Sequence, residues 1–140
     1  SLAVTKMVEE HLYWIGMYSR WMDPAGWETT KAAFFGPLPA YLKWFLPELM
    51  RKKMGKTLYT QGIGRHSAAE IYQFGVEDIN AIATMLGTKP YFWGDSPASI
   101  DATLYGFLAN TIWAPQDNIL KRHALNMPEL ISYCERIKAN

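Results

Sequence analysis

The sequence predicts an all-α fold, a helical bundle of about six or seven helices. Apolar residues recur at helical spacing along most of the 140 residues. Signals for helix starts and stops separate these stretches, whereas hairpin turns and strand–helix–strand alternation are nearly absent. A chain of this length is near the commonest size for one domain, so we expect a single bundle over residues 1–140.

The first half of the chain predicts three helices. Residues 2–22 carry an apolar stripe at helical spacing, and Asp23-Pro24 ends it because a residue before proline avoids helical geometry. Residues 27–35 form a short second helix. Residues 39–60 form the third, and Pro47 should kink it, since the proline ring removes a backbone donor and crowds the preceding turn.

The second half of the chain predicts four more helices. Ser67 and Glu70 form the pattern of a capping box, in which each side chain accepts a free N–H at the helix start. This helix should extend to residue 86, where Gly87 ends it. The next helix is apolar nearly all round, which predicts a central position in the bundle. This helix should span residues 99–113, and the last two helices should span residues 117–125 and 128–138.

Composition limits the class of protein. Hydrophobic residues make up 49% of the chain and the net charge is +1, which favours an ordered core and does not favour nucleic-acid binding. Cys134 is the only cysteine, so neither an internal disulfide nor a cysteine-rich metal site is expected. We find no signal peptide and no stretch long enough to cross a membrane, and we expect a cytoplasmic protein.

Two familiar kinds of site are disfavoured. The stretch Gly55-Lys56-Thr57 resembles the end of a phosphate-binding loop, but Met50 stands where that motif needs a glycine. The three histidines lie far apart without the spacing of metal ligands, so no metal site is predicted. Cys134 has no neighbouring base in its helix, and we expect it to be a packing thiol.

A basic cluster is formed by Arg51, Lys52, Lys53 and Lys56. A solvated helical face is the default interpretation of such a run. Contact with an acidic partner or with the charged edge of a ligand is the alternative, since local charge steers binding even at low net charge.

Aromatic residues of the first predicted helix are candidates for a ligand pocket. Tyr13, Met17 and Trp21 follow one another at a spacing of four and should share a face. Most aromatic side chains here should be core, but Tyr and Trp also line partly wet pockets. We therefore predict these three residues as tentative substrate-binding residues.

Asp101 lies in the first turn of the helix predicted over residues 99–113. As a structural acid it would accept hydrogen bonds from free backbone N–H groups and complement the helix dipole. As a catalytic carboxylate it would need a partner, and the sequence offers none. We favour helix capping for Asp101, as for Ser67 and Glu70.

Several stretches in order along the chain resemble the C-terminal domain of glutathione S-transferases, in the branch of the metaxins and the failed-axon-connections family. The resemblance is carried by residues 9–14 with 18–21, 61–67 with Glu70, 86–95, 97–108 and 133–137. One position departs from the family pattern. The family places Ser or Thr three residues before the aspartate of the buried helix, and here that residue is Ala98.

The resemblance implies a helical C-terminal domain whose parent also has an N-terminal thioredoxin-like domain. In the family that domain binds glutathione and activates its thiol, so glutathione would be the cosubstrate of the full-length protein if it is an enzyme. The 140 residues themselves would hold no cofactor and no catalytic residue, and alone they would be inactive. Their part would be one wall of the electrophile pocket, from Tyr13, Met17 and Trp21, and contacts of a homodimer.

Two other functions stay open. The parent could be a non-catalytic binding or scaffold protein on the same fold, as the metaxin-like resemblance suggests, because a fold does not decide function. An unrelated helical interaction module is the third interpretation.

Overall fold

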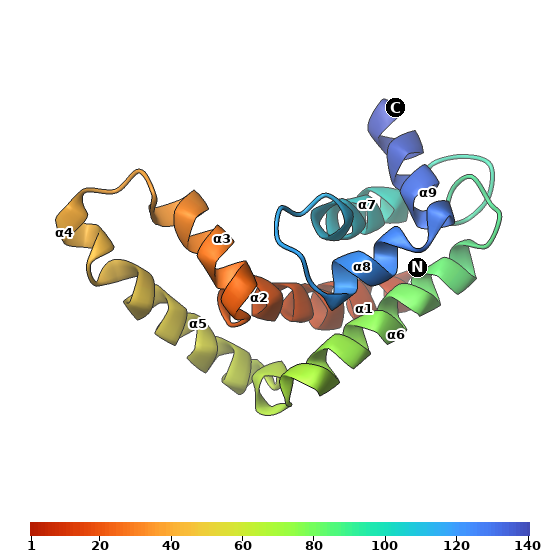
Figure 1. Cartoon of the computed structure of the whole chain (residues 1–140). Coiled ribbons are helices and arrows are strands. Elements are labelled where there is room, and N and C mark those ends of the chain that lie inside the picture. Colours follow the sequence, from red (N-terminus) through yellow and green to blue (C-terminus); the bar gives the residue numbers. More distant parts are fainter.

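The computed structural model describes residues 1–140, and its regular elements are all helices, which confirms the predicted fold class. Figure 1 shows the helices arranged as two lobes that open away from a common base. Residues 2–21 form one continuous helical rod, in which α1 (Leu2–Met7) passes through a π-helical turn (Val8–Leu12) into α2 (Tyr13–Trp21). Two short antiparallel contacts between Tyr91 and Gly94 are the nearest approach to sheet pairing.

The first lobe is an arm made of α3 (Pro24–Phe35), α4 (Ala40–Lys43) and α5 (Leu46–Gln61), which extends away from the rest of the molecule (Figure 1). The helix expected over residues 27–35 begins three residues earlier. Asp23 caps it by accepting the N–H of Ala25 at 3.1 Å, and Pro24 occupies the first turn, where its missing donor has no partner to lose.

The kinked helix expected over residues 39–60 is instead two helices. The chain leaves helical geometry at Phe45, where φ is −127°, and Pro47 lies in the first turn of α5. A proline inside a helix would leave a carbonyl without its donor, whereas in the first turn it leaves none. The chain therefore restarts the helix at Leu46 rather than bending through Pro47.

The second lobe contains α6 (Ala68–Leu86), α7 (Ser99–Ile112), α8 (Ile119–Leu125) and α9 (Pro128–Ala139). A short 3₁₀ turn over Ile63–Arg65 joins the arm to α6. The core lies between α7, the first rod and α6, and α8 and α9 close it (Figure 1). The buried apolar positions of α7 repeat at helical spacing and are Ile100, Leu104, Leu108 and Ile112. The other side of α7, which includes Tyr105 and Phe107, is only partly buried.

Two contacts set the angle between α2 and the arm. Gly26 lies so close to α2 that a Cβ there would come within 1.7 Å of the backbone oxygen of Ser19, so only glycine allows this approach. Asp23 at the corner also accepts a hydrogen bond from the hydroxyl of Tyr72 on α6, at 2.5 Å. The corner between α2 and α3 is thereby tied to the long helix of the other lobe.

Candidate functional site

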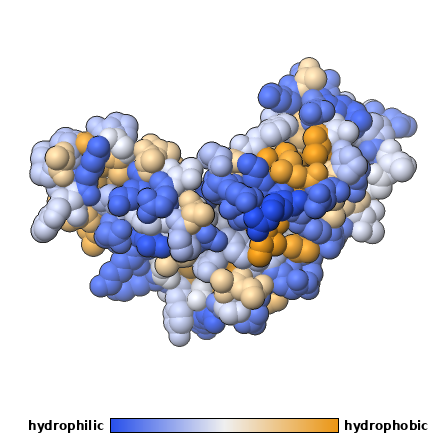
Figure 2. Space-filling model, in the orientation of Figure 1, coloured by the Kyte–Doolittle hydropathy of each residue, from blue (hydrophilic) through white to orange (hydrophobic).

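A cleft lies between the two lobes, where α2 and α3 face α7. It contains two hollows with volumes of about 520 Å³ and about 320 Å³, and a small recess of about 30 Å³. Residues Arg20 and Asn110 line all three, so the hollows and the recess form one continuous site. Figure 2 shows the surface hollowed between the lobes, with apolar and polar side chains side by side around the opening.

Two of the three predicted pocket residues lie in this cleft. Tyr13 and Met17 line the hollow of about 320 Å³, and Phe107 of α7 lines it from the other side. The rings of Tyr13 and Phe107 meet edge to face with centroids 6.1 Å apart. Tyr13 keeps 39% of its surface exposed. The first rod and α7, which are about 90 positions apart in the chain, therefore share one apolar wall.

Trp21 lies outside the cleft. Its ring packs against the arm, with centroid distances of 5.7 Å to Trp27, 6.3 Å to Phe34 and 6.5 Å to Phe35. The reason is helical geometry, since 3.6 residues per turn rotate a residue eight positions along by about 80° around the axis. The spacing of four keeps Tyr13 and Met17 on one face, but two such steps move Trp21 onto the face that meets α3.

The end of α2 is held by Thr30 and by Arg51, a member of the predicted basic cluster. The hydroxyl of Thr30 donates to the backbone oxygen of Arg20 at 2.8 Å, and Arg51 donates to those of Trp21 and Met22 at 2.9 Å and 3.0 Å. Its guanidinium also lies over the ring of Trp27 at 5.2 Å. Arg51 thus leaves the predicted solvated face and satisfies orphan carbonyls of α2. Lys52, Lys53 and Lys56 remain exposed.

Sequence reasoning also missed most of the cleft's polar residues and both of its glycines. Arg20 follows no site motif, and Gln116 lies in a loop without one, although both line the cleft. Gly16 and Gly106 offered a usable signal, since glycine inside a helix costs about 0.5–1 kcal/mol relative to alanine. A Cβ at either position would meet nothing within 4 Å, so both glycines face open space in the cleft.

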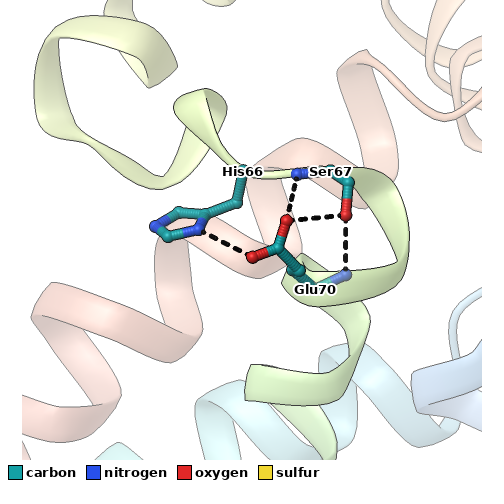
Figure 3. Close-up of polar contacts among 3 residues, drawn as sticks. All are labelled: His66, Ser67 and Glu70. Carbon is teal, nitrogen blue, oxygen red and sulfur yellow. Dashed lines mark hydrogen bonds and ion pairs between the residues drawn. The ribbon is translucent and has the colours of Figure 1, made fainter.

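The capping box at the start of α6 is formed in both directions (Figure 3). Ser67 Oγ accepts the N–H of Glu70 at 3.2 Å, and Glu70 Oε1 accepts the N–H of Ser67 at 3.1 Å. His66 adds a contact of 3.5 Å to the same carboxylate. The Ser67 backbone N–H, then its hydroxyl and His66, lower the pKa of Glu70. These residues lie outside the cleft and hold the start of a helix.

Asp101 is a buried hub, only 1% exposed. One carboxylate oxygen accepts the N–H of Ala98 at 2.7 Å, which is half of a capping box. The other accepts the N–H of Phe92 at 2.8 Å and the hydroxyl of Tyr133 at 2.6 Å. Burial and this hydrogen bond raise the pKa of Tyr133 well above its usual range. With no hydroxyl at Ala98 to accept it, the N–H of Asp101 donates to the backbone oxygen of Ala98 at 2.9 Å. The other donors to the carboxylate come from the preceding turn and from α9.

The remaining titratable groups do not gather into a reactive centre. His11 pairs with Asp78 at 2.6 Å, and burial raises the pKa of Asp78 although the bond to His11 works against the shift. His123 contacts the side chain of Asn80 at 2.7 Å. Burial raises the pKa of the Cys134 thiol to about 12. No group of His, Cys, Asp and Glu side chains could hold a metal ion, and no helix combines the length and apolar character of a membrane crossing.

Comparison with known proteins agrees with this fold. Residues 75–137 match the family described as glutathione S-transferase, C-terminal domain. The chain is 34% identical to an isoprene-epoxide–glutathione S-transferase of Rhodococcus sp. strain AD45, over 99% of this chain and 59% of that protein. It is 31% identical to Failed axon connections of Drosophila melanogaster, over 99% of this chain and 36% of that protein.

The metaxins are a third group of relatives. Metaxin-3 of Xenopus laevis is 28% identical over 98% of this chain and 47% of that protein. No solved structure matches the chain. The chain thus spans between about a third and three fifths of the length of these relatives. In fold and in sequence, the chain matches the glutathione S-transferase C-terminal domain family, and its relatives include Failed axon connections and the metaxins.

Proposed function

We propose that this domain forms one wall of the electrophile pocket of a glutathione-dependent transferase. The observation that carries the proposal is the hollow of about 320 Å³ in which Tyr13 and Met17 of α2 face Phe107 of α7. Small-molecule sites are concave and mostly apolar with a few polar groups, and this cleft has that character. The relative whose name is isoprene-epoxide–glutathione S-transferase supports an epoxide as the class of electrophile.

In the proposed reaction, the thiolate sulfur of glutathione attacks an epoxide carbon. A carbon–sulfur bond forms, the carbon–oxygen bond breaks, and the released oxygen takes up a proton. The domain's contribution would be to bind and orient the apolar electrophile and exclude water from it, which lowers the entropic barrier to attack. Glutathione itself would be held and activated by an N-terminal thioredoxin-like domain of the same protein.

The test begins with the coding sequence upstream of this chain, which should encode a thioredoxin-like domain of about 80–100 residues, within ordinary domain size. The full-length protein should then consume glutathione thiol in the presence of isoprene monoxide. Tyr13→Ala should raise KM for the epoxide, whereas Tyr41→Ala, which removes an exposed tyrosine outside the cleft, should leave it unchanged. Absence of the upstream domain, or equal kinetics for both variants, would overturn the proposal.

The second candidate is a non-catalytic binding or scaffold protein. Similarity to Failed axon connections and to the metaxins favours it, because those relatives carry no enzyme name. The two candidates differ at the upstream domain, where an enzyme needs a Tyr, Ser or Cys that activates the thiol. Robust conjugation by the full-length protein would exclude the scaffold role, and loss of that residue would favour it.

The proposal also includes a homodimer and a cytoplasmic location. Light scattering of the full-length protein at micromolar concentration should give twice the mass of one chain. Cell fractionation should recover it without detergent. A monomer, or a protein that requires detergent for release, would remove these two parts and leave the pocket assignment in place.

A further inference from the structure

The recess in the cleft has an unusual combination of polar groups. It lies where the two larger hollows meet, and Arg20 and Gln116 both line it. Its volume of about 30 Å³ has room for a small polar group but not for an aromatic ring. The larger hollows extend from it in two directions, so a bound molecule with a small head could leave its body in either.

Arg20 is the only charged side chain that lines the cleft. The ion pairs of the structure join His11 to Asp78, His66 to Glu70, and Arg122 to Asp117, so no carboxylate neutralises Arg20. Its one hydrogen bond runs across the cleft to the backbone oxygen of Asn110 and is long, at 3.4 Å. A guanidinium has five N–H donors, so most of those of Arg20 are free to bind an anion.

Gln116 is a second polar side chain of the recess. The residue is 8% exposed, and its amide pairs with no other residue but stays open to solvent rather than buried without a partner. An amide that is open to the recess keeps its N–H donors and its oxygen available to a bound molecule. The amide faces the recess, where its N–H₂ group could donate to an oxygen that Arg20 also binds.

The surroundings of the recess are apolar and kept open. Met17 and Phe107 line the hollow on one side, and Phe34, Tyr105 and Trp113 line the hollow on the other. Gly16 and Gly106 add no side chain where their helices face the cleft. The site therefore combines one positive charge and one carboxamide at its centre with aromatic and aliphatic walls.

We propose that this recess binds the carboxylate of an amphipathic small molecule, whose apolar body lies along the cleft. Arg20 would hold the two carboxylate oxygens with its planar fork, and Gln116 would donate a further hydrogen bond. The inference rests on the cleft being the small-molecule site of the proposed function, and it adds the chemical class of the ligand. A carboxylate is favoured over an amine or a neutral polar head because the cleft holds a cation and no anion.

The test compares two probes with the same apolar body, 2-naphthoate and 2-naphthalenemethanol, by calorimetry on the full-length protein. The wild type should bind the carboxylate about tenfold or more tightly than the alcohol, the range of a charge-assisted hydrogen bond. Arg20→Gln should abolish that preference and leave the alcohol's affinity unchanged. Arg20→Lys, which keeps the charge without the fork, should restore part of it, and Gln116→Leu should weaken the carboxylate alone.

Arg65→Gln is the matched control, because it removes the same charge from an exposed site outside the cleft. Thermal unfolding of each variant checks that it is folded. If both probes bind equally and Arg20→Gln changes neither, the carboxylate site is wrong while the cleft remains a pocket. If neither probe binds, both this inference and the proposed pocket fail. If Arg65→Gln reduces the preference as much as Arg20→Gln, general charge rather than the recess explains it.

Discussion

Replacing Asp101 by alanine should destabilise the protein far more than loss of an ordinary helix cap. The change leaves three donors without an acceptor, the N–H groups of Phe92 and Ala98 and the hydroxyl of Tyr133. Loss of a helix cap costs about 1 kcal/mol. A buried donor left unpaired costs about 1–3 kcal/mol, and two of the three are buried. The expected total is about 3–7 kcal/mol, a large part of the 5–15 kcal/mol typical of a domain.

The assay is urea unfolding of wild type and variant. Equal slopes of the unfolding free energy against urea concentration would show that the change has not altered the denatured state. Asp95→Ala is the matched control, since this exposed aspartate in the preceding turn should matter by less than about 0.5 kcal/mol. A double-mutant cycle with Tyr133→Phe isolates the bond between the two side chains and should give a coupling of about 0.5–3 kcal/mol.

Two results would refute this reasoning about Asp101. A cost below about 1 kcal/mol would mean that the carboxylate contributes no more than an exposed cap. Additive effects of Asp101→Ala and Tyr133→Phe would mean that the hydroxyl does not depend on the carboxylate. Loss of activity in the full-length protein at unchanged stability would instead point to a chemical role for Asp101.

Three further predictions concern single residues. Gly106→Ala should raise the stability by about 0.5–1 kcal/mol but weaken binding of 2-naphthoate, because its methyl group enters the cleft; calorimetry and thermal unfolding measure the two effects. Cys134, whose pKa burial raises to about 12, should resist Ellman's reagent at pH 8 in the folded protein and react once urea unfolds it; rapid reaction without unfolding would contradict its burial. Burial raises the pKa of Asp78, so its contribution to stability is fully present below the ordinary value of about 4 and is lost as the pH rises through the raised one. The stability of Asp78→Asn relative to wild type should therefore increase as the pH rises from about 4 to about 7. A difference between the urea midpoints of the two proteins that is the same at both pH values would contradict this.

Local signals predicted the helices well because the interactions behind them span only a few residues. The capping box joins Ser67 to Glu70, three positions away, and both bonds are formed. The main error in the helices lies at Pro47, where the sequence pattern predicts one kinked helix and the structure has two. Whether the helix bends or restarts depends on the backbone at Phe45, which apolar periodicity does not describe.

The cleft could be predicted only in part. Tyr13 and Met17 were found from aromatic composition and a spacing of four, and the small rotation over one step keeps them together. Trp21 lies outside the cleft because the rotation accumulates over two steps, which turns its side chain toward the arm. Arg20 and Gln116 carry no local sequence pattern, since their significance comes from tertiary placement: both line the recess, and Arg20 has no acidic partner there.

The sequence by itself determined the all-α class, the positions of the helices and the family, because caps, breaks and apolar periodicity act over one or two turns. Only the tertiary structure decided that Tyr133 completes the acceptor set of Asp101 from 32 positions away, and that α2 and α7 enclose a cleft. Such contacts depend on how whole helices pack to bury their apolar faces, and that packing minimises the free energy of the entire chain rather than of any one segment.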